Sequence, residues 1–391
     1  MPVIETELLA RNETDQFLGV ITLNRKKSLN ALDLKMVQLM ITCLEEWKED
    51  KKVVAVFIQG AGEKAFCAGG DVVSMYTAMN DLRTKETYAS NRKLEHPPEF
   101  LNEFFSQEYR LDYLIHCFPK PIITWGSGIV MGGGLGLFAA SKFAIVTETS
   151  RIAMPEITIG LFPDVGGSYF LNQMPKGIGL FLGLTGASFF ASDAAAIKLA
   201  THKLATIKKQ SLISQILTLP TVSEQSVEQL LNLLQAEDES EFAKLNGELC
   251  KFADKISILD TAKNLADIFS MLETMLTENP DSSWLNKALI NLKQGSPITA
   301  HLVFEQLQRS KGLSLADCFR QELSMALSCG MYGEFEEGVR ALLIDKDRTP
   351  NWSFKNINDV PLEVIESHFS YFDDVQNPLF QLEQDYGVLH G

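Results

Sequence analysis

Short apolar runs that alternate with helical segments limit most strongly what this chain can fold into. Residues 53–59 (VVAVFIQ) form a nearly continuous apolar run of strand length, as expected for a strand that is buried on both faces of a sheet. We predict three further strands, at residues 17–24, 122–125 and 143–147. Apolar residues at helical spacing predict an amphipathic helix over residues 33–48. The alternation continues to about residue 200 and predicts an α/β unit with parallel strand pairing.

The pattern changes near residue 206, after which helices dominate. Three segments there have residues that typically begin a helix: Thr221-x-x-Glu224, Ser296-Pro297 and Ser314-x-x-Asp317. In the first half, the charged segment 74–107 interrupts the alternation and is predicted to be an insertion with helical pieces. We therefore predict a core over residues 1–205, with the inserted segment at 74–107, and a helical C-terminal region over residues 206–391.

The charge balance argues against two classes of partner. Asp and Glu number 50 against 35 Lys and Arg, so the formal net charge at pH 7 is −15. An electrostatic field of this sign repels nucleic acid and anionic membrane surfaces. No uncharged apolar run approaches the roughly 20 residues of a membrane span. We expect no nucleic acid and no membrane among the partners of this protein.

The cysteines and the first residues bear on the compartment. The six cysteines are scattered without a C-x-x-C pair, which is typical of buried thiols in a reducing environment. The N-terminus has neither the basic and apolar segments of a signal peptide nor an Arg-rich amphipathic stretch. These features predict a cytoplasmic protein.

Common cofactor and metal motifs are missing from the sequence. There is no GxxxxGK[ST], HExxH or GxSxG, and the glycines from Gly126 to Gly132 follow GxGxxxG instead of the GxGxxG of dinucleotide folds. The six histidines are isolated. We therefore predict no metal ion and no cofactor, and a chemistry that relies on carboxylates and backbone amides.

Three segments have residues suited to that chemistry. Residues 64–71 (KAFCAGGD) and 128–136 (GIVMGGGLG) are rich in glycine, and residues 153–167 place Glu156 and Asp164 in an apolar run. Glycines at strand ends and helix starts expose backbone N–H groups, and two such groups aimed at one point form an oxyanion hole. The alternative is that the glycines only permit tight turns and close packing.

The two acids also have two interpretations. A carboxylate among apolar neighbours is either half of a core ion pair or a functional group with a raised pKa. No Lys or Arg occurs between residues 152 and 175, so an ion-pair partner would have to come from elsewhere in the chain.

These segments together resemble a known superfamily. AFCAGGD, GIVMGGGLGL and MPEITIGLFPDVGGSYFL are similar to the enoyl-CoA hydratase/isomerase (crotonase) superfamily. With the C-terminal stretch from Glu334 to Trp352, they resemble more narrowly its 3-hydroxyisobutyryl-CoA hydrolase branch, over about residues 15–355. The resemblance implies an α/β fold with a crotonase-type ββα spiral core and a long helical C-terminal region.

The resemblance also implies a site. The oxyanion hole falls on the amides of Gly70 and Gly133, the catalytic carboxylates on Glu156 and Asp164, and a further substrate contact on Glu108. Glu108, judged from its residue type and neighbours alone, would be a solvated helix residue. The implied contacts with coenzyme A are Lys26, Lys27, Ala68 and Asp71, and Arg25 is a further basic candidate. A solvated turn is the alternative for the basic residues 25–27.

One position departs from the hydratase pattern. Enoyl-CoA hydratases use two glutamates, one two residues after the glycine triplet and one at the position of Glu156, and the first position is here Gly136. Asp164 stands where the hydratases usually have glycine. The resemblance therefore implies hydrolysis of a short 3-hydroxyacyl-CoA, most specifically of 3-hydroxyisobutyryl-CoA to 3-hydroxyisobutyrate and CoA in valine catabolism.

Two other functions stay open at this point. One is an enoyl-CoA hydratase or isomerase, and the other is a non-catalytic acyl-CoA-binding protein. The substrate is in each case a small acyl-CoA, and assembly into a homo-oligomer is left open by the sequence.

Overall fold

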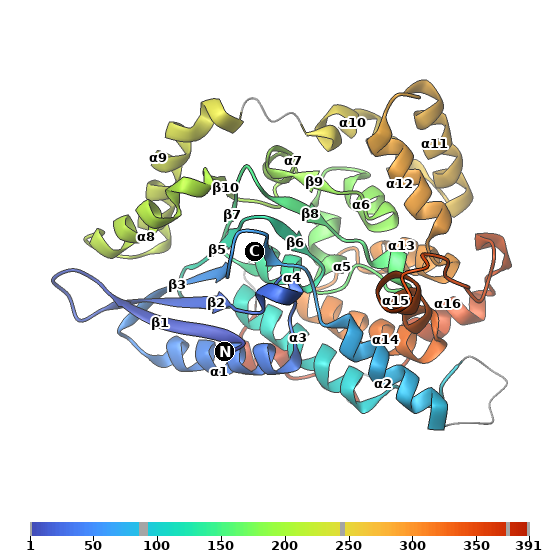
Figure 1. Cartoon of the computed structure of the whole chain (residues 1–391), viewed down its shortest axis with the longest axis horizontal. Coiled ribbons are helices and arrows are strands. Elements are labelled where there is room, and N and C mark those ends of the chain that lie inside the picture. The colour runs from blue at the N-terminus through green and yellow to red at the C-terminus, as the bar shows by residue number, and fades with distance from the viewer. Residues whose placement is uncertain (1, 86–92, 243–246, 373–375, 389–391) are drawn as a thin grey trace.

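The structure is a computed structural model, and it describes residues 2–85, 93–242, 247–372 and 376–388. Two sheets lie in the centre of the molecule and helices surround them (Figure 1).

The larger sheet has six strands in the order β1-β2-β3-β5-β7-β10. Their bounds are Ile4–Ala10 (β1), Phe17–Leu23 (β2), Val53–Gly60 (β3), Ile122–Gly126 (β5), Phe143–Val146 (β7) and His202–Lys203 (β10). All neighbouring pairs are parallel except β1 with β2, which pair antiparallel from Ile4 with Leu23 to Ala10 with Phe17. The four predicted strands and the parallel pairing are confirmed.

Both faces of this sheet are covered, which explains the continuous apolar run in β3. Successive side chains point to opposite faces, so Val56 and Ile58 join one core cluster while Ala55 and Phe57 join another. The second cluster is closed by α8 (Lys209–Thr218) and α9 (Glu224–Phe242), which pack over that face (Figure 1).

The smaller sheet determines where the three motif segments meet. Its strands are β4 (Ala65–Cys67), β6 (Ile129–Met131), β8 (Arg151–Ala153) and β9 (Phe189–Phe190), in that order. β4, β6 and β8 are parallel, so their carboxyl ends lie at the same edge. Each of the three sequence segments continues from one of these ends, and they therefore converge.

Helices of the first half cover the sheets. They are α1 (Leu34–Glu49), α2 (Val72–Lys85), α3 (Glu99–His116), α4 (Gly133–Ala140), α5 (Gly167–Phe170), α6 (Ile178–Thr185) and α7 (Ala191–Ala196). The α1 helix begins where predicted, because the Asp33 side chain accepts a hydrogen bond from the Met36 amide at 2.8 Å. The α2 helix and the start of α3 occupy much of the predicted insertion, whose residues 86–92 lie outside the described residues.

Most of the remaining helices follow residue 247. They are α10 (Glu248–Ser257), α11 (Leu265–Glu278), α12 (Ser283–Gln294), α13 (Pro297–Arg309), α14 (Leu315–Tyr332), α15 (Glu334–Val339), α16 (Leu362–Phe369) and α17 (Leu382–Tyr386). Ser296 and Ser314 cap α13 and α14 as predicted. The predicted cap of α9 at Thr221 is wrong, because Ser223 and Ser226 exchange the capping hydrogen bonds instead.

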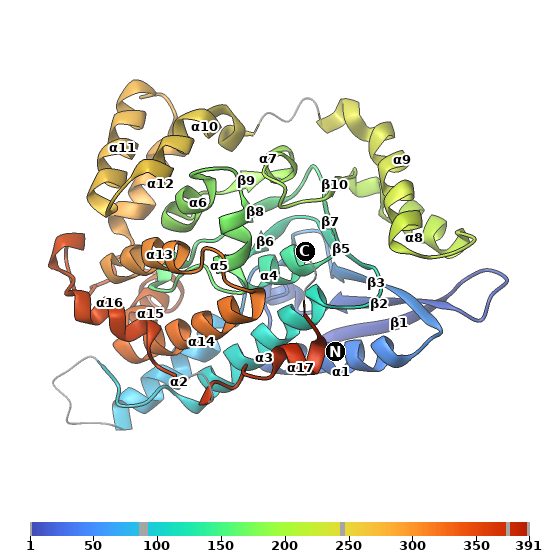
Figure 2. The same cartoon turned by 180° about the vertical axis from the view of Figure 1, so that it is seen from behind.

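One core cluster spans both predicted regions. It contains buried side chains from Ile4 near the N-terminus to Tyr386 near the C-terminus. Figure 2 shows the C-terminal helices α13 and α14 lying against α5 and α3 of the first half. The division at residue 206 stays a prediction. Within the described residues, no helix is both long enough and apolar enough to cross a membrane.

Candidate active site

The converging segments enclose a pocket of about 310 Å³. Six residues singled out in the sequence line it: Ala68, Gly70, Glu108, Gly133, Glu156 and Asp164. The structure thus brings together Gly70 and Gly133 of the predicted oxyanion hole and the carboxyls of Glu108, Glu156 and Asp164, whereas the predicted CoA contact Asp71 does not line this pocket. The six residues come from the segments that follow β4, β6 and β8 and from α3.

Two residues that line the pocket, Gly70 and Gly133, have backbone amides that no other described group accepts. Leu32 pairs with the 68–71 segment through its own N–H to the Gly69 carbonyl (2.8 Å) and through its carbonyl to the Asp71 N–H (2.7 Å). This parallel bridge leaves the Gly70 N–H on the opposite side. Gly133 is the first residue of α4, where a helix N–H has no intrahelical acceptor. Within the described residues, neither amide donates a hydrogen bond.

The glycines allow these segments to approach each other. Gly69 has φ +115°, and a Cβ placed there would be 3.8 Å from the Gly133 nitrogen. At Gly133, a Cβ would lie only 2.2 Å from Oε1 of Glu108. The carboxyl group of Glu108 therefore rests directly against the helix start, in space that any other residue at 133 would fill.

Glu108 is where reasoning from residue type alone fails. It would be a solvated helix residue by that reasoning, but it lies on the core face of α3 and is only 2% exposed. Burial, and then the charges of Asp164 and Glu156, raise the pKa of Glu108 well above its ordinary range. The family resemblance located this residue, whereas the local pattern did not.

Glu156 lines the pocket beside the glycine segment that leads into α4. It begins a short 3₁₀ turn, Glu156–Ile159, after the end of β8, and its Oε1 would be 3.1 Å from a Cβ at Gly132. Its Oε2 is buried and has no hydrogen-bond partner in the part of the chain that the structure describes. Burial, followed by the charge of Asp164, raises the pKa of Glu156 well above the usual value.

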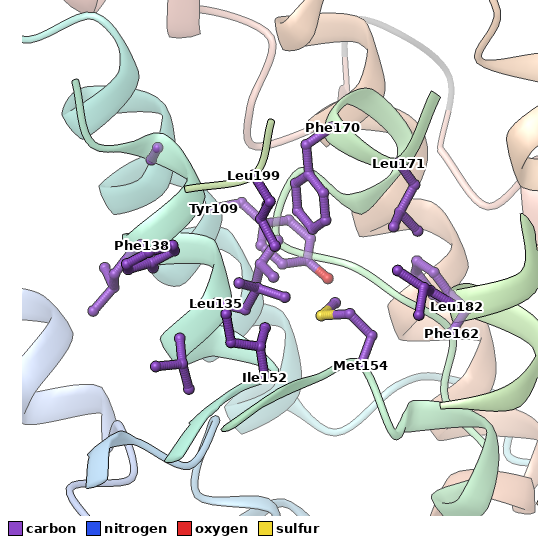
Figure 3. Packing of buried hydrophobic residues seen from close by; sticks show 14 of the residues in the cluster. Tyr109, Leu135, Phe138, Ile152, Met154, Phe162, Phe170, Leu171, Leu182 and Leu199 are labelled. Carbon is purple, nitrogen blue, oxygen red and sulfur yellow. The ribbon is translucent and has the colours of Figure 1, made fainter. Parts of the chain in front are cut away.

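Asp164 has a partner that the sequence did not suggest. The Tyr109 hydroxyl donates a hydrogen bond of 2.8 Å to Oδ2 of Asp164, and both residues are buried. Figure 3 shows Tyr109 among the apolar side chains of Leu135, Met154 and Phe162. Burial raises the pKa of Asp164 to about 6, and the Tyr109 hydrogen bond opposes that shift. Among the described residues, Asp164 is the one of the three pocket carboxyls that receives a hydrogen bond from another side chain.

The structure accounts for the glycine at 136. A Cβ there would be 2.6 Å from Cβ of Val165 and 2.8 Å from Oδ2 of Asp112. Asp112 is fully buried, neither of its oxygens has a hydrogen-bond partner within the described residues, and burial raises its pKa well above the ordinary value. Val165 and Asp112 thus occupy the space next to position 136, and a larger residue there must displace one of them.

The basic candidates differ in their surroundings. Arg25 is engaged inside the fold, with ion pairs to Asp71 (2.8 Å) and Asp33 (3.2 Å), so its guanidinium is not free for a phosphate. Asp71 also accepts a hydrogen bond from the Ser74 amide at the start of α2. Lys26 and Lys27 lie exposed on a short 3₁₀ turn, Lys26–Ser28.

The C-terminal region contributes to the pocket wall, which the sequence did not predict. Leu342 and Leu343 line the pocket from a π-helical turn, Arg340–Ile344, and Arg340 anchors the loop that follows through Asp345 and Asp347. Among the described residues, no group of three or more His, Cys, Asp or Glu side chains is arranged to hold a metal ion. That no metal and no cofactor takes part stays a prediction.

Comparison with known proteins gives consistent matches. The model of the enoyl-CoA hydratase/isomerase family matches residues 18–369. A zebrafish (Danio rerio) protein named "3-hydroxyisobutyryl-CoA hydrolase, mitochondrial" is 36% identical over 357 residues, which cover 91% of this chain and 88% of the relative. A human (Homo sapiens) protein with the same name is 34% identical over 351 residues, which cover 90% of this chain and 86% of the relative.

Solved structures share the fold. A carnitinyl-CoA dehydratase from Mycobacterium thermoresistibile has a TM-score of 0.77 and 29% identity, with 96% of this chain and 98% of that chain covered. An enoyl-CoA hydratase from Rhodobacter sphaeroides has a TM-score of 0.76 and 31% identity, with 93% and 97% covered. The predicted crotonase-type fold with its helical C-terminal region is confirmed.

Proposed function

The chain belongs to the enoyl-CoA hydratase/isomerase family, and on that premise we propose that it hydrolyses the thioester of a short 3-hydroxyacyl-CoA. The proposed substrate is 3-hydroxyisobutyryl-CoA, and the products are 3-hydroxyisobutyrate and CoA. The relatives named as 3-hydroxyisobutyryl-CoA hydrolases cover about nine tenths of this chain and support the choice of substrate.

One observation carries the proposal. Gly70 and Gly133, whose amides donate no hydrogen bond within the described residues, line the same pocket as the buried carboxyls of Glu156 and Asp164, and this supports the proposal. Thioester hydrolysis passes through a tetrahedral intermediate whose oxygen becomes negative, and two converging N–H groups stabilise that oxygen. The loss of one such donor costs about 3–4 kcal/mol in activation free energy. The start of α4 adds the favourable end of a helix dipole at Gly133.

Glu156 is the proposed reacting carboxylate. In one route it removes a proton from water as the water oxygen attacks the thioester carbon, and the CoA thiolate then leaves and is protonated. In the other route, an oxygen of Glu156 attacks the same carbon, and the CoA thiolate leaves and is protonated. Water then hydrolyses the resulting mixed anhydride, which releases the 3-hydroxy acid and restores the Glu156 carboxylate. Both routes use the same oxyanion hole, and both require Glu156 to be ionised.

Asp164 and Glu108 are proposed to bind the 3-hydroxyl group of the substrate. Asp164 holds its charge more readily than the other two carboxyls, because Tyr109 donates to it. A substrate hydroxyl placed here would donate to Asp164, which is buried and poorly solvated. Neighbouring acids of this kind titrate as a coupled group, so the protonation of one affects the others.

The alternative of a hydratase or isomerase is less well supported. The solved structures of highest similarity named above are titled as a dehydratase and a hydratase, and they share the fold. The hydratase pattern, however, needs a glutamate at position 136. Gly136 supplies no carboxyl, and Val165 and Asp112 fill the adjacent space.

The compartment and pathway are also proposals. The names of the relatives specify mitochondria, so the predicted cytoplasmic location has no support from them. Hydrolysis of 3-hydroxyisobutyryl-CoA would place the enzyme in valine degradation. Tagging the chain and following it by cell fractionation distinguishes the two locations.

The test is a thiol-release assay on the purified chain. We expect free CoA from 3-hydroxyisobutyryl-CoA and little loss of conjugated absorbance from crotonyl-CoA. Glu156→Gln should abolish nearly all CoA release while acyl-CoA binding survives. Glu334→Gln is a matched control, because Glu334 is also buried, at 2% exposed, but lies outside the pocket lining.

Three results would contradict the proposal. The first is hydration of crotonyl-CoA without thiol release, which would favour a hydratase. The second is tight binding of short 3-hydroxyacyl-CoA thioesters without any turnover, which would favour a binding protein. The third is near-normal turnover by Glu156→Gln, which would refute the role of Glu156.

A further inference from the structure

The turn that carries Asp164 has an unusual backbone. Val165 has φ +53° and Gly166 has φ +85°, so two consecutive residues lie in the left-handed region. A β-branched residue such as Val is rarely found there, because its side chain crowds the backbone. Within the turn, the Gly167 N–H donates to the Asp164 carbonyl at 2.8 Å. A conformation of this kind persists only when surrounding groups hold it.

Glu322 holds one side of the turn. It belongs to α14, is 0% exposed, and receives the Gly166 N–H on Oε2 and the Ser168 N–H on Oε1, each at 2.8 Å. One side chain thus binds the backbone amides of Gly166, itself one of the two left-handed residues, and of Ser168.

Gln306 holds the other side. It belongs to α13 and is also 0% exposed, and its Nε2 donates to the Pro163 carbonyl at 2.7 Å and to Oγ of Ser168 at 2.8 Å. Pro163 directly precedes Asp164. The turn is therefore held both before and after Asp164, by Gln306, which comes 143 residues after Pro163, and by Glu322, which comes 156 residues after Gly166.

The α14 helix also supports the Asp164 side chain. Phe319, one turn before Glu322, packs its ring on Tyr109 with a centroid distance of 5.7 Å. Tyr109 in turn donates to the carboxylate of Asp164. Figure 2 shows α13 and α14 next to α5, the helix that begins just after this turn.

We infer that Glu322 and Gln306 are positioning residues that hold the 163–168 turn and so aim the Asp164 carboxylate into the pocket. This inference rests on the proposed function, and it gives the C-terminal helical region a part in catalysis. A displacement of about 1 Å in a reacting group can reduce the rate by roughly 100-fold, so a loosened turn should lower kcat strongly. The amides of the oxyanion hole and the exposed surface near Lys26 lie on other segments and keep their proposed contacts with the substrate. KM should therefore rise much less than kcat falls, and the small rise reflects the 3-hydroxyl group that Asp164 is proposed to bind.

The test compares kcat and KM for thiol release from 3-hydroxyisobutyryl-CoA. Glu322→Gln keeps the shape of the side chain but turns one acceptor oxygen into an NH₂ group, which cannot accept a backbone N–H. We expect kcat to fall about 10- to 100-fold with KM within about threefold of the wild type. Gln306→Met removes the hydrogen-bond donor and keeps a side chain of similar volume, so it should have the same effect. This variant replaces Glu322→Gln in the test if Glu322→Gln does not fold.

The matched control is Asp193→Asn. Asp193 is also a 0% exposed carboxylate, and it accepts backbone N–H groups from Phe190 and Cys250, but it lies outside the pocket lining. It should cost comparable thermal stability and leave kcat unchanged. A general loss of packing would instead lower kcat in both variants.

A double-variant cycle tests whether the effect passes through Asp164. In the Asp164→Asn background, Glu322→Gln should change kcat by less than about twofold, because contacting residues that act as a unit are not additive. The inference is overturned by an equal fold-loss in both backgrounds, or by folded Glu322→Gln with kcat within threefold of the wild type. If Asp164→Asn leaves no measurable rate, the separate effects of Glu322→Gln on kcat and on KM decide the test. Failure of the proposed function can be told apart from failure of this inference, because the wild type itself would then release no thiol.

Discussion

Gly136→Ala is a small change that tests how the site is built. The added Cβ would lie 2.6 Å from Cβ of Val165, while ordinary contact begins at 3.4 Å, so the two segments must separate by about 0.8 Å. Val165 adjoins Asp164, so the separation displaces the Asp164 turn. We expect kcat to fall about 10- to 100-fold, because reacting groups tolerate little displacement.

The stability effect should be smaller than the effect on activity. Overpacking a core typically costs about 1–3 kcal/mol in the free energy of unfolding. Alanine in place of glycine inside α4 returns up to about 1 kcal/mol through its higher helix propensity. The net loss is therefore about 0–2 kcal/mol, which a thermal or urea melt would detect as a modest shift.

The assay pairs thiol release with such a melt. Gly330→Ala in α14 is a matched control, because a Cβ there meets the Cδ2 end of the flexible Leu101 side chain at 2.4 Å and no part of the turn. Wild-type kcat in Gly136→Ala would refute the reasoning. Hydration of crotonyl-CoA by Gly136→Glu would also refute the reasoning, because it would mean that position 136 has room for the glutamate of the hydratases.

Three further outcomes follow from the site. The kcat/KM value should rise with pH, because Glu156 must lose its proton to react and burial raises its pKa. Activity should therefore be lost as the pH falls through that raised pKa, and a midpoint at the ordinary glutamate pKa would contradict this expectation. The double variant Lys26→Glu/Lys27→Glu should raise KM at low salt, less so at high salt, and leave kcat little changed. A KM that does not depend on salt would mean that neither lysine contacts CoA. Tyr109→Phe keeps the ring but removes the hydrogen bond to Asp164, and because a hydrogen bond to a charged group is worth about 1.5–3 kcal/mol, kcat should fall about 10- to 150-fold. An unchanged kcat would mean that this hydrogen bond does not serve catalysis.

Local features of the chain were predictable from sequence. The strands β2, β3, β5 and β7 appear where apolar runs predicted them, since burial pattern and strand length are properties of a few consecutive residues. The caps at Ser296 and Ser314 were also predictable, because a cap bonds to an amide three residues away. The cap at Ser223 was missed because Thr221 offers the same chemistry two residues earlier.

The site itself was only partly readable. Family resemblance located Gly70, Gly133, Glu156 and Asp164, and the structure brings all four to one pocket. Glu108 shows the limit of local reasoning, because the exposure of a helix residue depends on what packs against that face of the helix.

What the sequence determined by itself was the set of elements and the family, because periodicity, capping and motif spacing are written in neighbouring residues. What only the tertiary structure decided was which groups meet. Parallel pairing of β4, β6 and β8 brought three segments to one edge, and α14 brought Glu322 to the Asp164 turn from more than 150 residues away. The physical reason is that hydrogen bonds, charges and contacts act over a few ångströms in space, whatever the distance along the chain.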